Sequence, residues 1–350
     1  MKKSLVTLIV LALMAVVVLP LLAGCTTGPV LRIFNWEDYI DPDVLTKFTK
    51  ETGIKVKYVT ITDNEKMYTK IKSGAKYDVV FPSDYMIQRL IAEDLLAKVD
   101  TSKMTNFANV SDFTLGRDFD ADNDYSVPYM WGTLGILYNT AKIAEVTDFN
   151  ALWDANHSGQ IIMMDSVRDA TAVALMLSGY TPNDITEASL AAAQTKLMEQ
   201  KPLLMKYALD EAKNDMKRGN ATMALVYSGD ASTSILEAAE AGITLDYVAP
   251  EGTNIWFDNM VVPAASTMQD EAARFIDFMC REDIALMNAE YIGYFSPIGT
   301  ITEDLIAAGD QPDLLPTQAE RDLMVAFTDP SQALREAMDK MWTSVKAKAK

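Results

Sequence analysis

The sequence predicts an α/β protein, because short apolar runs with the character of strands alternate with amphipathic segments of helical length. An alternation of this kind favours a parallel sheet with helices on both faces. The chain has 350 residues, of which 49% are hydrophobic and 23% charged, and is long enough for two domains with separate cores. No internal repeat, low-complexity tract or long linker interrupts the pattern.

The first part of the chain shows the alternation most clearly. Asp41 and Pro42 are typical of a helix cap and a first turn, and Gly53 is typical of a helix end. The strands expected here are 30–34, 55–60 and 77–81. The helices expected between and after them are 43–52, 64–73 and 84–93.

The rest of the chain repeats this pattern after a passage that contains Gly132 and Gly135, which predicts a crossing between two domains. Strands are expected at 124–128, 132–139, 160–164, 224–227, 245–249 and 261–262. Helices are expected at 170–177, 188–200, 210–218, 231–241, 271–281, 284–289 and 332–348.

The beginning of the chain has the features of an export signal that ends in a lipid attachment site. Two lysines precede an apolar run at 5–22, and small residues then lead to Cys25. This order resembles a bacterial lipobox, so we predict a signal peptide at 1–24 and a lipidated tether at 25–29. The alternative is an uncleaved membrane anchor, because the run approaches the length of a spanning helix. Either interpretation places the remaining chain on the periplasmic or extracellular face of a bacterial membrane.

The net charge is −18 for the whole chain and −20 without the two lysines of the leader. This balance argues against nucleic acid as a partner, because phosphate binding needs clusters of Lys and Arg. An acidic protein suits a cationic ligand, although acidity also serves solubility. If Cys25 carries lipid, Cys280 is left unpaired, and stability must come from the core rather than from a disulfide.

Signatures of catalysis are scarce. The single histidine, His157, lies in a polar loop, which excludes a His-rich metal site and makes a Ser-His-Asp triad depend on that one residue. The sequence has no CxxC, HExxH, GxSxG or P-loop motif, and no GxGxxG opens a helix. We therefore expect no catalytic residue, no metal and no cofactor; a hydrolase with paired aspartates is the catalytic alternative.

Aromatic, hydroxyl and carboxylate side chains recur at the ends of the expected strands. Ligands of open α/β sheets bind outside the carboxyl ends of strands, so these side chains predict one shared site between two lobes. Aromatic faces attract ammonium groups and carboxylates pair with them, which indicates a small positive solute. The candidate segments are Trp36–Tyr39, Ser83–Tyr85, Asp165–Asp169, Tyr227–Asp230 and Trp256–Asp258.

Several candidates also have a purely structural interpretation. Trp36 has the size of a core residue, and Ser83 stands where a helix cap is expected. Asp169 has Arg168 as a neighbour and lies near a helix N-terminus, so an ion pair or a helix-dipole contact would also explain it. Asp230 is compatible with a capped turn.

The segment around Asp258 is the strongest candidate. Alternation along an extended segment places Asp258 on the same face as Trp256. A lone carboxylate beside a tryptophan on a strand edge is less often structural, so we predict that this pair contacts the ligand.

Motifs spread over the whole mature chain occur together in one known family. They are Phe34-Asn35-Trp36-x-Asp38-Tyr39, Phe48-x-x-Glu51-Thr52-Gly53-Ile54-x-Val56, Tyr77-Asp78-Val79-Val80-x-Pro82-Ser83-x-Tyr85, Asp124-Tyr125-Ser126-Val127-Pro128-Tyr129-x-Trp131-Gly132-Thr133, Trp256-x-Asp258 and Ile292-Gly293-Tyr294. In these motifs the sequence resembles the polyamine-binding proteins of ABC transporters, the periplasmic or lipid-anchored receptors for spermidine and putrescine.

The resemblance implies a type II periplasmic binding protein fold, in which two α/β lobes joined by a hinge close on a ligand cleft between them. The chain would cross between the lobes near 132–134 and 254–257, with a third passage near Thr300. The lobes implied are 30–133 plus 257–300 for the first and 134–256 plus 301–350 for the second.

The resemblance also implies roles for single residues. The box around the polyamine chain would be formed by Trp36, Tyr39, Tyr85, Tyr227 and Trp256, with Tyr294 as a further lining residue. The ammonium groups would meet Asp38, Asp169 and Asp258, and Ser83 would add a hydroxyl contact. Asp230 matches a branch of the family that favours putrescine.

Some positions depart from the family pattern. Tyr227 stands where many members have Trp, and Asp169 stands where a spermidine-preferring member has Glu. Ser166 replaces an acid that some members have, and a glutamine near the C-terminus has no clear equivalent around Phe327. This mixture leaves the choice between putrescine and spermidine open.

The predicted function is an extracytoplasmic polyamine receptor, a monomer held to the membrane through Cys25, that delivers its ligand to the permease of an ABC transporter. The first alternative is a receptor for another small organic cation, such as a quaternary amine or a basic amino acid. The second is a lipid-anchored hydrolase that uses paired Asp residues, and the third is a sensor or adhesin that binds no small ligand.

Overall fold

The computed structural model describes residues 28–347 of the chain. The predicted signal peptide at 1–24 and the predicted lipid attachment at Cys25 lie outside the described residues. Within the described part, no helix combines the length and the apolar character needed to cross a membrane.

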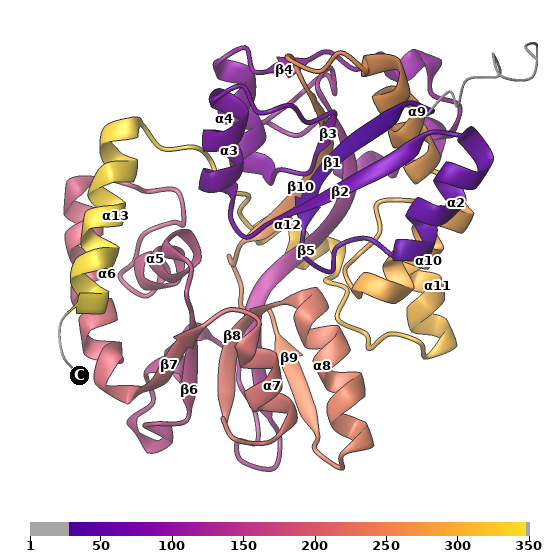
Figure 1. The fold of residues 1–350 in the computed structure, drawn as a ribbon. Coiled ribbons are helices and arrows are strands. Elements are labelled where there is room, and N and C mark those ends of the chain that lie inside the picture. The colour runs from indigo at the N-terminus through magenta and orange to yellow at the C-terminus, as the bar shows by residue number, and fades with distance from the viewer. Residues whose placement is uncertain (1–27, 348–350) are drawn as a thin grey trace, which may run out of the picture.

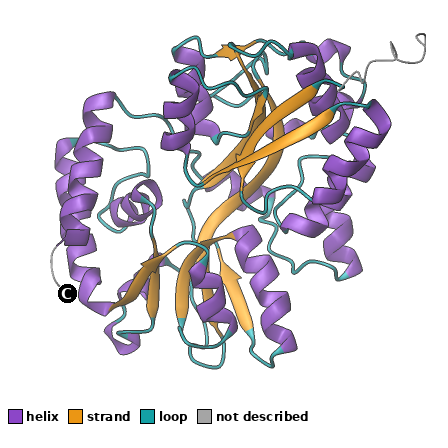
Figure 2. Cartoon of the chain, in the orientation of Figure 1, coloured by secondary structure: helices purple, strands orange, loops and turns teal. Residues whose placement is uncertain are grey.

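Strands and helices alternate along the described chain (Figure 2). The strands are β1 (Val30–Trp36), β2 (Lys55–Ile61), β3 (Val79–Val80), β4 (Leu96–Ala97), β5 (Ser126–Asn139), β6 (Ile161–Met164), β7 (Leu204–Ala208), β8 (Met223–Tyr227), β9 (Leu245–Val248) and β10 (Ile255–Pro263). The α-helices are α2 (Pro42–Thr52), α3 (Asn64–Lys72), α4 (Asp84–Ala92), α5 (Val167–Met176), α6 (Glu187–Gln200), α7 (Glu211–Lys217), α8 (Ser228–Glu240), α9 (Gln269–Met279), α10 (Glu282–Ile292), α11 (Ile301–Ala308), α12 (Gln318–Leu323) and α13 (Gln332–Ala347).

The two strands expected at 124–128 and 132–139 form one continuous strand, β5. Gly132 and Gly135 do not break this strand. Their missing side chains let Trp256 and Val248 approach the backbone of β5. A Cβ on Gly132 would lie 2.5 Å from Cζ2 of Trp256, and one on Gly135 would lie 2.3 Å from the carbonyl oxygen of Val248. The sequence prediction also missed β4, β7, α11 and α12.

The strands form a single path in the order β2-β1-β3-β10-β5-β8-β6-β7, with β4 on β10 and β9 on β5. The outer strands pair in parallel: β1 with β2 and β3, and β6 with β7 and β8. At the centre, β5 and β10 run antiparallel to each other and to their other partners. The expectation of a parallel sheet is therefore wrong at the centre, where two long strands cross between the lobes.

Two lobes surround separate hydrophobic cores. The first-lobe core contains Phe48 and Phe275, with a second cluster around Phe34 under α3 and α4. The second-lobe core contains Leu197 and Val345, with another cluster around Leu137. Figure 1 shows β1, β2 and β3 in the upper lobe and β6, β7, β8 and β9 in the lower one, with β5 extending between them.

The predicted lobe boundary at residue 301 does not coincide with a change of core. Ile301 and Leu305 of α11 are buried in the first-lobe core, because α11 packs against α10. Beyond α11, Leu314 packs against the cluster around Leu137, and Trp342 of α13 packs in the second-lobe core.

The segment 324–330, between α12 and α13, connects the lobes by polar contacts. Asp329 Oδ1 accepts a hydrogen bond from Arg89 Nη2 of α4 at 2.6 Å, and Asp329 Oδ2 accepts one from Arg335 Nη1 of α13 at 2.7 Å. On the second-lobe side, Asn183 Nδ2 donates to the carbonyl oxygen of Ala326 at 2.9 Å. These contacts connect α4 of the first lobe with α13 and Asn183 of the second lobe.

Candidate functional site

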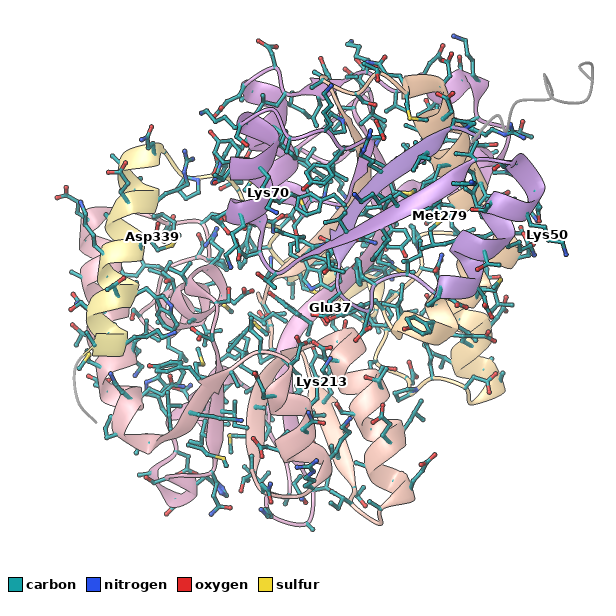
Figure 3. The ribbon with its side chains drawn as sticks, viewed as in Figure 1. Glu37, Lys50, Lys70, Lys213, Met279 and Asp339 are labelled. Atoms are coloured by element: carbon teal, nitrogen blue, oxygen red, sulfur yellow. The ribbon has the colours of Figure 1, made fainter. Side chains whose placement is uncertain are left out.

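The candidate residues come from strand ends and helix starts where the two lobes face each other. Trp36 is the last residue of β1, Tyr227 is the last residue of β8, and Ser83 and Asp169 lie at the starts of α4 and α5. Figure 3 shows Glu37, which follows β1, at the lower edge of the first lobe. The carboxyl ends of strands thus supply this region, as expected for an α/β sheet.

Four aromatic rings from separate elements form a continuous row. The ring centroids of Tyr227 and Trp256 are 5.7 Å apart, those of Trp256 and Tyr294 are 4.9 Å apart, and those of Tyr294 and Tyr39 are 5.8 Å apart. Each pair meets edge to face, the arrangement that ring quadrupoles favour. The structure therefore brings these four predicted residues together.

Asp258 lies beside this row and is only 7% exposed. Its Oδ2 accepts a hydrogen bond from the Tyr39 hydroxyl at 2.9 Å, whereas Oδ1 is buried without a hydrogen-bond partner among the described residues. Burial raises the pKa of Asp258 to about 6, although the Ser83 and Tyr39 hydroxyls act in the opposite direction. A buried carboxylate oxygen without a partner is costly, and an ammonium group would satisfy it.

Two tryptophans also have buried polar atoms that make no hydrogen bond. The Nε1 donors of Trp36 and Trp256 are buried without a hydrogen-bond partner within the part of the chain that the structure describes. Indole N–H groups usually find a partner when buried. Trp36 also packs against both clusters of the first-lobe core, so the interpretation of Trp36 as a core residue is supported too.

Asp169 is a second buried carboxylate, 4% exposed. Its Oδ2 accepts hydrogen bonds from the Tyr227 hydroxyl, at 2.9 Å, and from Ser166. Burial raises its pKa, while Ser166 and Tyr227 oppose the shift. The alternative of an ion pair with Arg168 is wrong for the described structure, because Arg168 donates to Pro182 O and Asn183 Oδ1 instead.

Ser83 and Tyr85 flank the start of α4. Ser83 occupies the N-cap position, but its side chain makes no capping hydrogen bond in the described structure; its hydroxyl accepts from Asn64 Nδ2 at 3.0 Å. The Tyr85 hydroxyl donates to Glu65 Oε1 at 3.1 Å. Burial, and then the charge of Glu65, raises the pKa of Tyr85, so its phenol stays protonated and remains a donor.

Two predicted carboxylates are placed differently. Asp38 is exposed, with a left-handed φ of +50°, and has no ion pair among the described residues. Asp230 lies in the first turn of α8, where Lys213 Nζ donates to its Oδ1 at 2.9 Å. Asp38 therefore has no cationic partner among the described residues, and Asp230 is already paired with Lys213.

The sequence analysis missed Asp84, although it stands between two predicted residues. It is 1% exposed, and its carboxylate accepts from the backbone N–H groups of Tyr85, at 2.7 Å, and Phe257, at 3.3 Å. Burial raises its pKa to about 8, and the nearby Asp258 charge adds to the shift. Acidic residues are common in the first turn of a helix, so the position of Asp84 at the start of α4 gives no sequence signal for a site.

Comparisons with known proteins identify the family of the chain. Residues 43–330 match the family model described as bacterial extracellular solute-binding protein. The spermidine/putrescine-binding periplasmic protein of Escherichia coli K12 is 35% identical over 272 residues, which are 76% of this chain and 77% of the relative. The putrescine-binding periplasmic protein SpuD of Pseudomonas aeruginosa is 30% identical and covers 93% of this chain and 94% of the relative.

Solved structures give the same result. The putative spermidine/putrescine ABC transporter protein from Listeria monocytogenes is 37% identical with a TM-score of 0.85, covering 91% of this chain and 99% of that chain. The substrate-binding protein PotD from Streptococcus pneumoniae is 35% identical with a TM-score of 0.79 and the same coverage. With its two lobes and its long match to the family model, the chain belongs to the bacterial extracellular solute-binding proteins.

Proposed function

We propose that this chain is an extracytoplasmic receptor that binds a polyamine, putrescine or spermidine, and delivers it to the permease of an ABC transporter. The observation that carries the proposal is Asp258, a buried carboxylate with an unpartnered oxygen beside the aromatic row. Such a group favours a cation with apolar flanks over a neutral or anionic solute.

In this proposal Asp258 accepts from one ammonium group and Asp169 from another, while the methylenes lie against the rings of Tyr227, Trp256 and Tyr294. Each charge-assisted hydrogen bond contributes roughly 1.5–3 kcal/mol, and a desolvated cation–π contact adds about 1–2 kcal/mol. After ordering costs, two ends plus stacking reach about −8 kcal/mol, which corresponds to a micromolar Kd.

The names of the relatives support the ligand class. Those from Escherichia coli and Pseudomonas aeruginosa are named for spermidine and putrescine, and the solved neighbours are named for polyamine ABC transporters. We extend that ligand and that transporter partnership to this chain. We also propose that it acts as a monomer anchored by a lipid on Cys25 and has no catalytic activity.

Calorimetric titration of the soluble form that starts after Cys25 tests the ligand. Putrescine and spermidine are the ligands, and betaine and lysine are the controls. Saturable 1:1 binding of a polyamine at a micromolar or lower Kd is the expected result. Heat from betaine or lysine alone would indicate another cation receptor, and the absence of binding by all four would overturn the proposal.

Polyamine affinity is expected to fall about tenfold between pH 7 and pH 5. The ligand is fully protonated in this range, so the change follows Asp258: its pKa of about 6 lies above the ordinary 3.8, and the carboxyl becomes neutral as the pH falls. The tyrosines that face it, Tyr39, Tyr129 and Tyr294, have raised pKa values and stay neutral. Titrations at half-unit steps measure the profile, and the Asp258→Asn variant should lack this step.

A further inference from the structure

The antiparallel pairing between β3 and β10 continues beyond the last residue of β3. Both strands lie in the upper lobe of Figure 1, with α4 in the same lobe. After β3, the carbonyl oxygen of Pro82 accepts a hydrogen bond from the Asn259 N–H at 3.1 Å. Ser83 and Asp258 then form an isolated antiparallel bridge in the same register. The segment that leads into α4 is therefore paired with the segment that carries Asp258.

Asp84 extends this ladder by one more step with its side chain. In an antiparallel ladder every second residue pair is joined by backbone hydrogen bonds, so after Asn259 the next N–H of β10 that needs an acceptor is that of Phe257. Asp84 lies opposite Phe257 in this register, but it is the first residue of α4, so its backbone turns into the helix. Its Oδ2 accepts from the Phe257 N–H at 3.3 Å, and its Oδ1 accepts from the Tyr85 N–H at 2.7 Å. The carboxylate thus takes the place of a backbone carbonyl group.

The hydrogen bond from Phe257 lies in the middle of the part of β10 that serves the candidate site. Phe257 is the residue between Trp256 and Asp258, and its side chain is 1% exposed. The neighbouring step of the ladder is weak, because Pro82 has no N–H and its pair with Asn259 has a single backbone hydrogen bond. Asp84 therefore contributes much of what holds this segment against the start of α4.

The burial of Asp84 is costly for the fold. Asp84 is 1% exposed, and among the described residues its hydrogen bonds come from two backbone N–H groups and from no lysine or arginine. A buried carboxylate without a cationic partner destabilises the native state, and functional sites are where such groups concentrate. The stability of α4 alone does not explain an acid at this depth.

We propose that Asp84 is a positioning residue, which holds the Phe257 N–H and so keeps the Asp258 carboxylate in place for the ammonium group of the ligand. This inference rests on the proposed function and adds a residue that acts on the ligand through another one. Asp84 serves binding without contact to the polyamine, since each of its oxygens faces a backbone N–H group.

Amide hydrogen exchange, measured by NMR in the ligand-free protein, tests the hydrogen bond itself. Asp84→Asn keeps the size of the side chain but turns one acceptor into a donor that faces an N–H group. The Phe257 amide should exchange at least tenfold faster than in the wild type, and the Val261 amide, where β3 and β5 pair with β10 on both sides, should not change. Asp84→Ala, which removes both acceptors, should show the same difference. An acid that only stabilises the helix N-terminus would leave the exchange of Phe257 unchanged, and that result would overturn the inference.

A double-mutant cycle with Asp258→Asn tests the link to the ligand. Calorimetric Kd values are measured for putrescine and for spermidine. Asp84→Asn should weaken binding about tenfold in the wild-type background but less than threefold in the Asp258→Asn background, because the carboxylate that Asp84 positions is absent there. Asp43→Asn is the matched control, since Asp43 is an exposed acid in the first turn of α2, and its Kd should stay within threefold of the wild type.

The outcomes separate this inference from the proposed function. An unchanged Kd in Asp84→Asn, or an equal loss in both backgrounds, would overturn the role of Asp84, while polyamine binding by the wild type would uphold the proposed function. If the wild type binds neither putrescine nor spermidine, the proposed function and this inference both fail.

Discussion

The Asp258→Asn variant is expected to bind its polyamine about a hundredfold more weakly than the wild-type protein at pH 7.5. Asn keeps an oxygen that accepts from the Tyr39 hydroxyl, so the shape of the site is preserved. The negative charge that the ammonium group needs is lost in a buried place, where water does not replace it. Calorimetric titration measures the change in Kd.

The same variant should not lose stability, which separates binding from folding. The folded-state pKa of Asp258 is about 6 and its ordinary value is 3.8, so the native state holds the proton more tightly than the unfolded state. The charged form therefore costs folding free energy above pH 6, about 3 kcal/mol for a shift of this size. In the ligand-free state at pH 7.5, the Tm of Asp258→Asn should equal or exceed that of the wild type.

Asp270→Asn is the control for this prediction, since Asp270 is an exposed acid in the first turn of α9. It loses the same charge far from the aromatic row and should change the Kd less than threefold at moderate salt. An Asp258→Asn protein that binds as tightly as the wild type would remove Asp258 from the site and with it the main support for a cationic ligand.

The parts of the site that could be predicted from the sequence are those that local geometry determines. Alternation along an extended segment placed Trp256 and Asp258 on one face, and both meet the tyrosine cluster. Strand ends also gave Tyr39 and Tyr227 correctly as neighbours of carboxylates. Asp38 was predicted from its place between two aromatic residues and from the family resemblance, and in the structure it is exposed with a left-handed backbone.

The parts that could not be predicted depend on contacts through space. The pairing of Lys213 with Asp230 requires α7 and α8 to pack side by side, and the contact of Arg89 with Asp329 joins segments 240 residues apart. Burial is the main cause that raises the pKa of Asp84, and the residues around Asp84 in the sequence do not indicate that it is buried. The centre of the sheet is antiparallel because β5 and β10 run in opposite directions between the lobes. The composition of these two strands does not indicate their direction.

The Gly229→Ala variant is expected to lose both stability and binding, because there is no room for a Cβ between α8 and Tyr294. A Cβ on Gly229 would lie 2.2, 2.4 and 2.5 Å from Cδ1, Cγ and Cε1 of the Tyr294 ring. The ring or the start of the helix must move, which we expect to cost about 1–3 kcal/mol of unfolding free energy. The movement also separates Tyr294 from Trp256 and Asp230, so the polyamine Kd should rise at least tenfold.

The Tyr294→Ala background shows whether the ring causes the loss. Without the ring, the added methyl group meets no clash with it, and alanine favours a helix over glycine by up to about 1 kcal/mol. Gly229→Ala should therefore destabilise the wild-type protein but stabilise the Tyr294→Ala protein, a reversal that denaturant unfolding of the four proteins measures as a coupling energy. Equal losses in both backgrounds would mean that the strain arises elsewhere in α8, and that Gly229 does not set the position of Tyr294. A reversal would show that a glycine at the start of one lobe's helix lets an aromatic residue from the other lobe reach the site.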